Sequence, residues 1–148
     1  MPNLPRRHVL LGLLSLSACS APEPPPSRAA AGPAEINRLI ADYASRYEVP
    51  EDLVHRVVQR ESRYNPAARN GPYWGLMQIH PQTARTMGFR GEPPELLDAE
   101  TNLRYAVKYL RGAWLVSRGD RNEAVKWYAH GYYYEAKRLG LLEATGLA

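Results

Sequence analysis

Apolar positions recur at intervals of three and four residues from Glu35 onward, the spacing of helices that bury one face. The first run ends at Val49-Pro50, because proline interrupts a helix, and Pro50 then opens a second helix. Acidic residues in the first turn of that second helix favour its start. The apolar positions of the first run are Ile36, Leu39, Ile40, Tyr43, Ala44 and Tyr47.

The same spacing, together with capping aspartates and helix-ending glycines, predicts further helices downstream. We expect them at residues 81–87, 98–118, 120–128 and 132–139. Residues 73–79 lack this spacing, so we expect a short β-ribbon or an irregular loop there. Packed helices over about 115 residues make one domain of ordinary size. The pattern therefore predicts an all-α fold in a single small domain.

One acidic residue continues an apolar helix face. Leu53 and Val57 lie one turn apart in the second predicted helix, and one more turn along that face is Glu61. Pro66 limits how far the helix runs, so Glu61 lies near its C-terminus, where the helix dipole disfavours negative charge. Partial burial acts in the same direction and favours the protonated acid. Glu61 is thus either a solvated helix-end residue or a general acid.

Several short motifs follow one another around this acid, and their order and spacing resemble the catalytic domain of the soluble-type (SLT) lytic transglycosylases. These bacterial enzymes of the lysozyme superfamily cut peptidoglycan. The resemblance covers roughly residues 51–139 and implies a lysozyme-like helical fold. The motifs are Glu61-Ser62-Arg63-Tyr64-Asn65-Pro66, Gly75-Leu76-Met77-Gln78-Ile79, Pro81 with Thr83-Ala84, residues 97–103, Lys108-Tyr109-Leu110 and Trp127-Tyr128-Ala129-His130-Gly131.

The resemblance implies roles for individual residues. Glu61 matches the family's single catalytic glutamate, Tyr128 matches a tyrosine beside the catalytic carboxyl or the substrate, and Asn102 matches a structural polar position. Gln78 must find a polar partner, for which sugar hydroxyls and the Glu61 carboxyl are candidates. The candidate substrate-binding residues are Gln78, Met77, Tyr128, Ser62, Tyr73 and Trp74.

The chain departs from the family pattern in two places. Ala129 stands where an asparagine is usual after Tyr128, and His130 follows it as either a cleft residue or a surface residue. A serine common before the Gly-Leu-Met-Gln run has no clear counterpart, and Asn70 is the nearest residue. These differences affect details of substrate binding and rate more than the class of reaction.

No good second carboxylate accompanies Glu61, since the nearby acids lie in a proline-rich loop or at a helix start. A lone acid fits cleavage of the MurNAc-GlcNAc β-1,4 bond with formation of 1,6-anhydro-MurNAc ends, as the resemblance implies. One alternative is a hydrolytic muramidase or chitinase-like enzyme on the same fold. Another is a non-catalytic wall-binding scaffold, which Ala129 suggests and the retained Glu61 opposes.

The N-terminal segment has the features of a bacterial lipoprotein signal. A basic start precedes a short apolar run, and Leu16-Ser17-Ala18-Cys19 resembles a lipobox; a plain signal peptide cut elsewhere is the alternative. Cys19 is the only cysteine, which excludes an internal disulfide. We expect a signal peptide at 1–18, a lipidated Cys19 with a Pro/Ala-rich tether at 19–33, and a catalytic domain at 34–148. The expected location is the periplasmic face of the envelope, with Ser20 favouring the outer membrane.

Charge and composition narrow the range of partners. The formal net charge of the 148 residues is +4, and without Arg6 and Arg7 it is +2 from Cys19 onward. There is no dense basic run of the kind that binds nucleic acid. The four histidines lack the paired spacing of zinc sites, so no metal and no cofactor is expected. The expected partners are peptidoglycan strands and, through Cys19, a membrane, with the protein itself a monomer.

Overall fold

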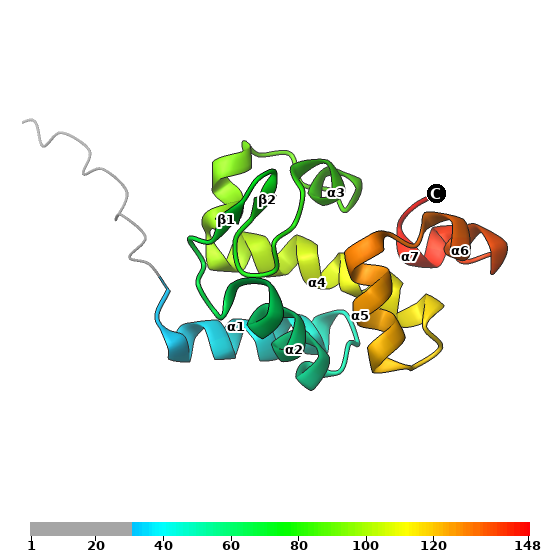
Figure 1. The fold of residues 1–148 in the computed structure, drawn as a ribbon, viewed down its shortest axis with the longest axis horizontal. Coiled ribbons are helices and arrows are strands. Elements are labelled where there is room, and N and C mark those ends of the chain that lie inside the picture. The colour runs from blue at the N-terminus through cyan, green and yellow to red at the C-terminus, as the bar shows by residue number, and fades with distance from the viewer. Residues whose placement is uncertain (1–30) are drawn as a thin grey trace, which may run out of the picture.

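The computed structural model describes residues 31–148, which fold mainly into helices (Figure 1). The predicted signal peptide, Cys19 and most of the tether lie outside these residues. The elements, in chain order, are α1 (Pro33–Arg46), α2 (Glu51–Ser62), β1 (Arg69–Asn70), β2 (Tyr73–Trp74), α3 (Pro81–Thr86), the 3-10 helix η1 (Pro93–Leu97), α4 (Ala99–Val116), α5 (Arg121–His130), α6 (Tyr133–Arg138) and α7 (Leu142–Thr145).

Helix α4 is the central element, and most other elements pack around it (Figure 1). Its 18 residues present a fully buried face to α1, α3, α5, α6, α7 and η1. Burying these side chains removes a continuous apolar stripe from water, which is the main force that holds the helices together. Among the residues of this face are Leu103, Ala106, Val107, Leu110 and Ala113.

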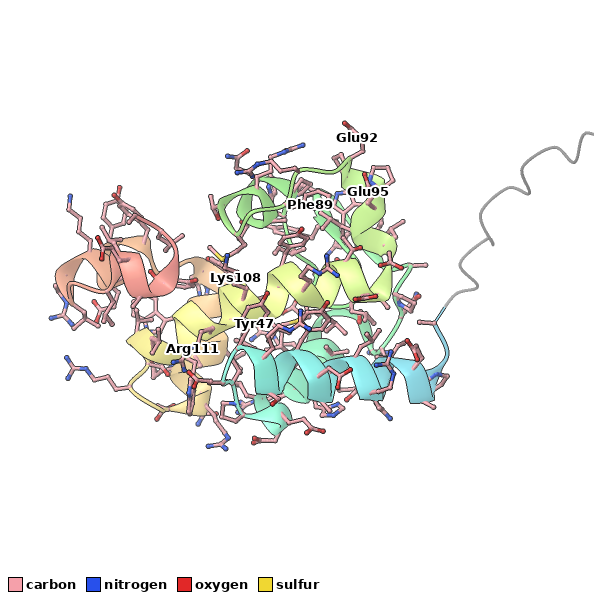
Figure 2. All side chains as sticks on the ribbon, turned by 180° about the vertical axis from the view of Figure 1, so that it is seen from behind. Tyr47, Phe89, Glu92, Glu95, Lys108 and Arg111 are labelled. Carbon is pink, nitrogen blue, oxygen red and sulfur yellow. The ribbon has the colours of Figure 1, made fainter. Side chains whose placement is uncertain are left out.

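Two cations of α4 hold the ends of neighbouring helices (Figure 2). Lys108 donates to the carbonyl of Met87 after α3 at 2.9 Å, and Arg111 donates to the carbonyl of Glu48 after α1 at 3.1 Å. Met87 is the C-terminal cap of α3, where carbonyls lack partners within the helix and carry the negative end of its dipole, whereas Glu48 lies just beyond the cap of α1. These contacts therefore fix both helices relative to α4.

The predicted all-α class and single small domain are confirmed. The predicted capping residues are found at the starts of two helices. Asp98 accepts a hydrogen bond from the Thr101 N–H at the start of α4, and Asp120 accepts one from the Glu123 N–H at the start of α5, both at 2.9 Å. The element bounds agree with the predicted helices to within a few residues. The short helices η1 and α7 were not predicted.

The expected β-ribbon begins earlier than residues 73–79. It is an antiparallel hairpin in which Arg69 pairs with Trp74 and Asn70 with Tyr73. Gly71, at φ +56°, permits the tight turn between the strands. An isolated bridge from Trp74 to Ile79 then closes the following turn. Within residues 31–148, no helix is long and apolar enough to cross a membrane.

Candidate active site

Glu61 lies at the last turn of α2, and the backbone reverses directly after it. Arg63 and Tyr64 both have left-handed backbone conformations, at φ 52° and 62°, which end the helix. The hydroxyl of Tyr64 lies 2.8 Å from Nδ1 of His55 on α2, which ties the Tyr64 side chain back to the same helix. The buried face of α2 leads up to Glu61, whose side chain is 24% exposed. The predicted position of Glu61 near a helix end is therefore confirmed.

Glu61 opens into a cleft made of two adjoining cavities. The first cavity, of about 390 Å³, is lined by Arg60, Glu61, Asn70, Tyr73, Gln78, Tyr128 and Ala129. The second cavity, of about 250 Å³, is lined by Tyr73, Gln78, Ile79, His80, Thr83, Tyr109, Tyr128, Ala129, His130 and Gly131. Four residues line both, so the cleft runs without interruption from α2 across the hairpin to α5. Among the residues that line it, Glu61 is the only carboxylate.

Burial raises the pKa of the Glu61 carboxyl above its ordinary value of 4.5. Arg60 acts in the opposite direction, with Nε 3.5 Å from Glu61 Oε1, but its side chain is half exposed and its charge is screened by water. The balance favours a carboxyl that holds its proton to higher pH than a solvated glutamate. A raised pKa is the direction of shift that a general acid requires.

Tyr128 joins α5 to the turn after β2. Its hydroxyl donates to the carbonyl of Met77 at 2.8 Å, and its ring packs edge-on against Tyr109, with ring centroids 5.5 Å apart. Burial first, and the nearby Glu61 charge second, raise the pKa of Tyr128 well above its ordinary value. The hydroxyl thus stays protonated. Its hydrogen bond goes to the backbone, so Tyr128 influences Glu61 by proximity.

A buried asparagine holds the turn that forms the cleft floor. The Asn102 side chain on α4 accepts from the Met77 N–H at 2.9 Å and donates to the carbonyls of Trp74 and Leu96, each at 2.8 Å. Gly75 lies against it at φ +74°, and a Cβ there would be 2.3 Å from Asn102 Nδ2. The structural role expected for Asn102 is therefore observed.

Gln78 lines both cavities, as predicted, but the partners of its amide differ from the expected ones. Its Nε2 donates to the carbonyls of Gly75 and Ala68, at 2.9 and 3.0 Å. Its backbone is left-handed at φ 48°, which turns the chain at the end of the Gly75–Gln78 turn. The amide nitrogen thus braces the floor, and within residues 31–148 Oε1 receives no hydrogen bond.

Three of the predicted substrate-binding residues lie away from the cavity walls, whereas Tyr73 lines both cavities. Met77 is fully buried in the core, and only its carbonyl meets Tyr128. Ser62 donates to the carbonyl of Val58 within α2. The Trp74 ring is covered by the guanidinium of Arg69, whose Cζ lies 3.4 Å from the ring centroid.

Several cleft residues were not singled out as substrate-binding by the sequence. Asn70 lies where the family serine was sought, which is a signal that could have identified it. Tyr109 faces the cleft through its contact with Tyr128, and α4 periodicity alone gives no such signal. The remaining additions are Arg60, Ile79, His80, Thr83, Ala129 and Gly131. His130, which we expected as either a cleft residue or a surface residue, lines the second cavity and is exposed. Over residues 31–148, no group of three or more His, Cys, Asp or Glu side chains is placed to hold a metal ion.

Comparison with known proteins identifies relatives of this domain. The Buchnera aphidicola membrane-bound lytic murein transglycosylase E is 38% identical over 82 residues, covering 50% of this chain and 37% of the relative. The Escherichia coli K12 soluble lytic murein transglycosylase is 34% identical over 87 residues, covering 53% of this chain and 13% of the relative. The chain thus spans well under half the length of either relative.

A solved structure has the same fold. The crystal structure of the 70 kDa soluble lytic transglycosylase from Escherichia coli superposes with a TM-score of 0.63 at 28% identity, over 76% of this chain and 19% of that one. The model of the Transglycosylase SLT domain family matches residues 38–140, which is more than half of the chain. The motifs around Glu61 and the helical architecture agree with this match. The chain therefore belongs to the Transglycosylase SLT domain family.

Proposed function

We propose that this protein is a peptidoglycan lytic transglycosylase in which Glu61 is the sole general acid and base. The single observation that carries the proposal is the cleft with one carboxylate, whose pKa is raised by burial. Relatives named as lytic murein transglycosylases support the same reaction class. Glycoside hydrolases ordinarily place a second carboxylate across the bond to act on water or on the sugar.

The first step is proton donation by Glu61. The protonated carboxyl gives its proton to the oxygen of the MurNAc-GlcNAc β-1,4 bond, and the bond between that oxygen and the MurNAc anomeric carbon breaks. The N-acetyl group of the MurNAc residue stabilises the positive charge that develops. The departing GlcNAc leaves with a free hydroxyl, and Arg60, 3.5 Å away, stabilises the new Glu61 carboxylate.

The second step closes the sugar on itself. The Glu61 carboxylate takes the proton of the MurNAc C6 hydroxyl while O6 bonds to the anomeric carbon. This restores the protonated acid and leaves a 1,6-anhydro-MurNAc end without consuming water. Tyr128 and Asn102 hold the turn that faces Glu61, so the acid and the cleft floor keep a fixed separation through both steps.

A hydrolytic muramidase would use the same acid but give a reducing end. Mass spectrometry of the fragments released from purified peptidoglycan separates the two, because anhydro-muropeptides are lighter by one water. We expect the chain from Cys19 onward, carrying Cys19→Ser, to release anhydro-muropeptides. Reducing products from this protein would establish the hydrolase instead.

Glu61→Gln keeps the size of the side chain and removes its proton chemistry, so turnover should fall about 10²–10⁴-fold. The matched control is Glu51→Gln, an exposed glutamate in the first turn of the same helix, which should retain wild-type turnover. A Glu61→Gln protein with near-native activity would sink the assignment. Strand binding without any release by the wild type would favour the scaffold alternative.

The proposal extends to location. Lipidation of Cys19 would place the domain at the periplasmic face of the envelope, at the end of the proline-rich tether, and Ser20 favours the outer membrane. The mass of the membrane-extracted protein should include acyl chains on Cys19. An unmodified mass in the membrane fraction would refute the anchor.

A further inference from the structure

Two histidines from different elements line the second cavity. His80 precedes α3, and His130 is the last residue of α5. Each ring uses Nδ1 on the backbone of its own segment, so Nε2 is the ring nitrogen that remains available. The group that Nδ1 contacts determines whether Nε2 donates or accepts a hydrogen bond. That group is a donor for one histidine and an acceptor for the other, so the two Nε2 atoms have opposite roles.

His80 presents a hydrogen-bond donor. The N–H of Gln82 lies 3.0 Å from His80 Nδ1, and a backbone N–H can only donate. Nδ1 therefore carries the lone pair, and the ring proton sits on Nε2. The edge-on contact between Tyr73 and His80, with ring centroids 5.9 Å apart, fixes the ring plane further.

His130 presents a hydrogen-bond acceptor. Its Nδ1 lies 2.9 Å from the carbonyl oxygen of Lys126, and a carbonyl can only accept. Nδ1 therefore carries the proton, and in the neutral ring Nε2 holds the lone pair. The two rings that line the second cavity thus have opposite roles at Nε2, a donor in His80 and an acceptor in neutral His130.

We propose that the second cavity is a sugar subsite that reads a secondary amide through these two histidines. A secondary amide has one C=O acceptor and one N–H donor, the complement of His80 Nε2–H and His130 Nε2. The acetamido group of an N-acetylated sugar is the amide that a glycan strand carries on each ring. This inference rests on the proposed function and names what the cleft recognises beyond the bond that is cut.

The position and size of the second cavity fit one sugar. It adjoins the Glu61 cavity through Tyr73, Gln78, Tyr128 and Ala129, so a strand held at Glu61 continues into it. Its volume of about 250 Å³ lies below the roughly 300–1,000 Å³ of sites for drug-sized ligands. The aromatic rings of Tyr73 and Tyr109 supply apolar wall for a sugar face.

A stem peptide attached to the strand also carries secondary amides, so the test separates the two sources. The protein is the chain from Cys19 onward with Cys19→Ser and Glu61→Gln, which prevents cleavage and removes the carboxylate that would attract an amine. The probes are the N-acetylglucosamine trimer, its de-N-acetylated form, the trimer re-acetylated from that form, and a free stem tetrapeptide. Calorimetry measures the affinity for each.

The variants keep the backbone contact and remove Nε2. In His80→Asn the short amide still caps α3, and in His130→Asn it still donates to the Lys126 carbonyl. We expect each variant to bind the N-acetylglucosamine trimer about threefold to tenfold more weakly and the de-N-acetylated trimer unchanged. Asn122→Ala, exposed on the same helix as His130, is the control and should bind as the parent does.

The outcomes are separate from those for the catalytic proposal. Re-acetylation should restore the parent's affinity, and loss confined to the tetrapeptide would assign the amide to the stem. Equal affinity of the parent for the acetylated and de-N-acetylated trimers, absence of binding to the acetylated trimer, or unchanged binding in both histidine variants would overturn the subsite. A wild-type protein that releases reducing products would overturn the transglycosylase reaction and leave these affinities as they are.

Discussion

Glu61 occupies a partly buried position at the end of α2, where its ionised form is unfavourable. The apolar face of α2 carries the acid into a site where it is 24% exposed, at the helix end whose carbonyls repel negative charge. Burial raises its pKa, so the folded state binds the Glu61 proton more tightly than the unfolded chain does. Stability and chemistry therefore make opposite demands on this position.

Glu61→Gln should be more stable than the wild type at pH 7. The ionised acid destabilises the folded state fully above its raised pKa, and this penalty disappears as the pH falls to below the ordinary value of 4.5. Thermal melting of both proteins from pH 4 to pH 8 should therefore give a difference that grows with pH. Glu51→Gln, exposed on the same helix, should show a difference within about 0.5 kcal/mol throughout, and a Glu61→Gln difference that ignores pH would contradict the argument.

At the scale of elements, the turn from Gly75 to Gln78 forms the floor of the cleft without regular structure of its own. Asn102 supplies the pairing that strands would otherwise give, through one accepted and two donated hydrogen bonds. Gly75 leaves the space that the asparagine fills. The geometry of the floor is therefore set from α4, a separate element.

Asn102→Ala should lower the free energy of unfolding by about 3 kcal/mol or more, because it leaves the Met77 N–H and the Leu96 carbonyl without partners and removes one of the two donors to the Trp74 carbonyl. Chemical denaturation measures this, and turnover should fall together with stability as the floor loosens. Asn122→Ala on the surface of α5 is the matched asparagine control and should change stability by no more than about 0.5 kcal/mol. Equal costs for the two substitutions would refute the role of Asn102.

The helices were predictable because their signals are local. Apolar spacing located α1, α2 and α4, and Asp98 and Asp120 marked two starts that the structure confirms as caps. We predicted the hairpin too far along the chain, because strands of two residues carry no alternating pattern of apolar and polar residues. The helix η1 depends on a reciprocal cap between Glu92 and Glu95, a spacing that we read as a loop (Figure 2).

The site was predictable where the motif fixes an element and less so where the backbone turns. Glu61 followed from the apolar face of its helix, and Tyr128 followed from the family motif. Met77 and Gln78 are adjacent in a turn, and the left-handed backbone at Gln78 decides which of them faces the cleft. The second cavity is formed by four separate elements, and no local sequence pattern predicts that these elements meet.

At the scale of the whole molecule, the start of α6 packs closely against α4, because the contact on α4 is a glycine. Tyr132 lies directly over Gly112, and its hydroxyl donates to the carbonyl of Tyr109 at 2.8 Å. The Tyr132 and Tyr109 ring centroids are 4.7 Å apart, and Tyr109 lines the second cavity. The close approach at Gly112 thus positions one wall of the cleft.

Gly112→Ala should destabilise the fold, although alanine favours a helix by about 1 kcal/mol over glycine. The added Cβ would lie 2.1 Å from the Tyr132 hydroxyl and 2.4 Å from Cζ of its ring, so the ring has to move. A net loss of about 1–3 kcal/mol is expected from such overpacking. Thermal melting measures this change. A variant at least as stable as the wild type would show that Tyr132 and α6 shift to admit the added Cβ without loss of stability.

The hydrogen bonds that form the cleft join residues distant in the chain. Met77 is 25 residues from Asn102 and 51 from Tyr128, whereas the helices form from contacts within a few residues. Closing such long loops comes late in folding, since their entropy is lost before the contacts compensate it. The cleft therefore depends on contacts between elements that are far apart in the chain, whereas each helix depends mainly on contacts within itself. Under the proposed function, turnover would therefore measure whether these long-range contacts have formed.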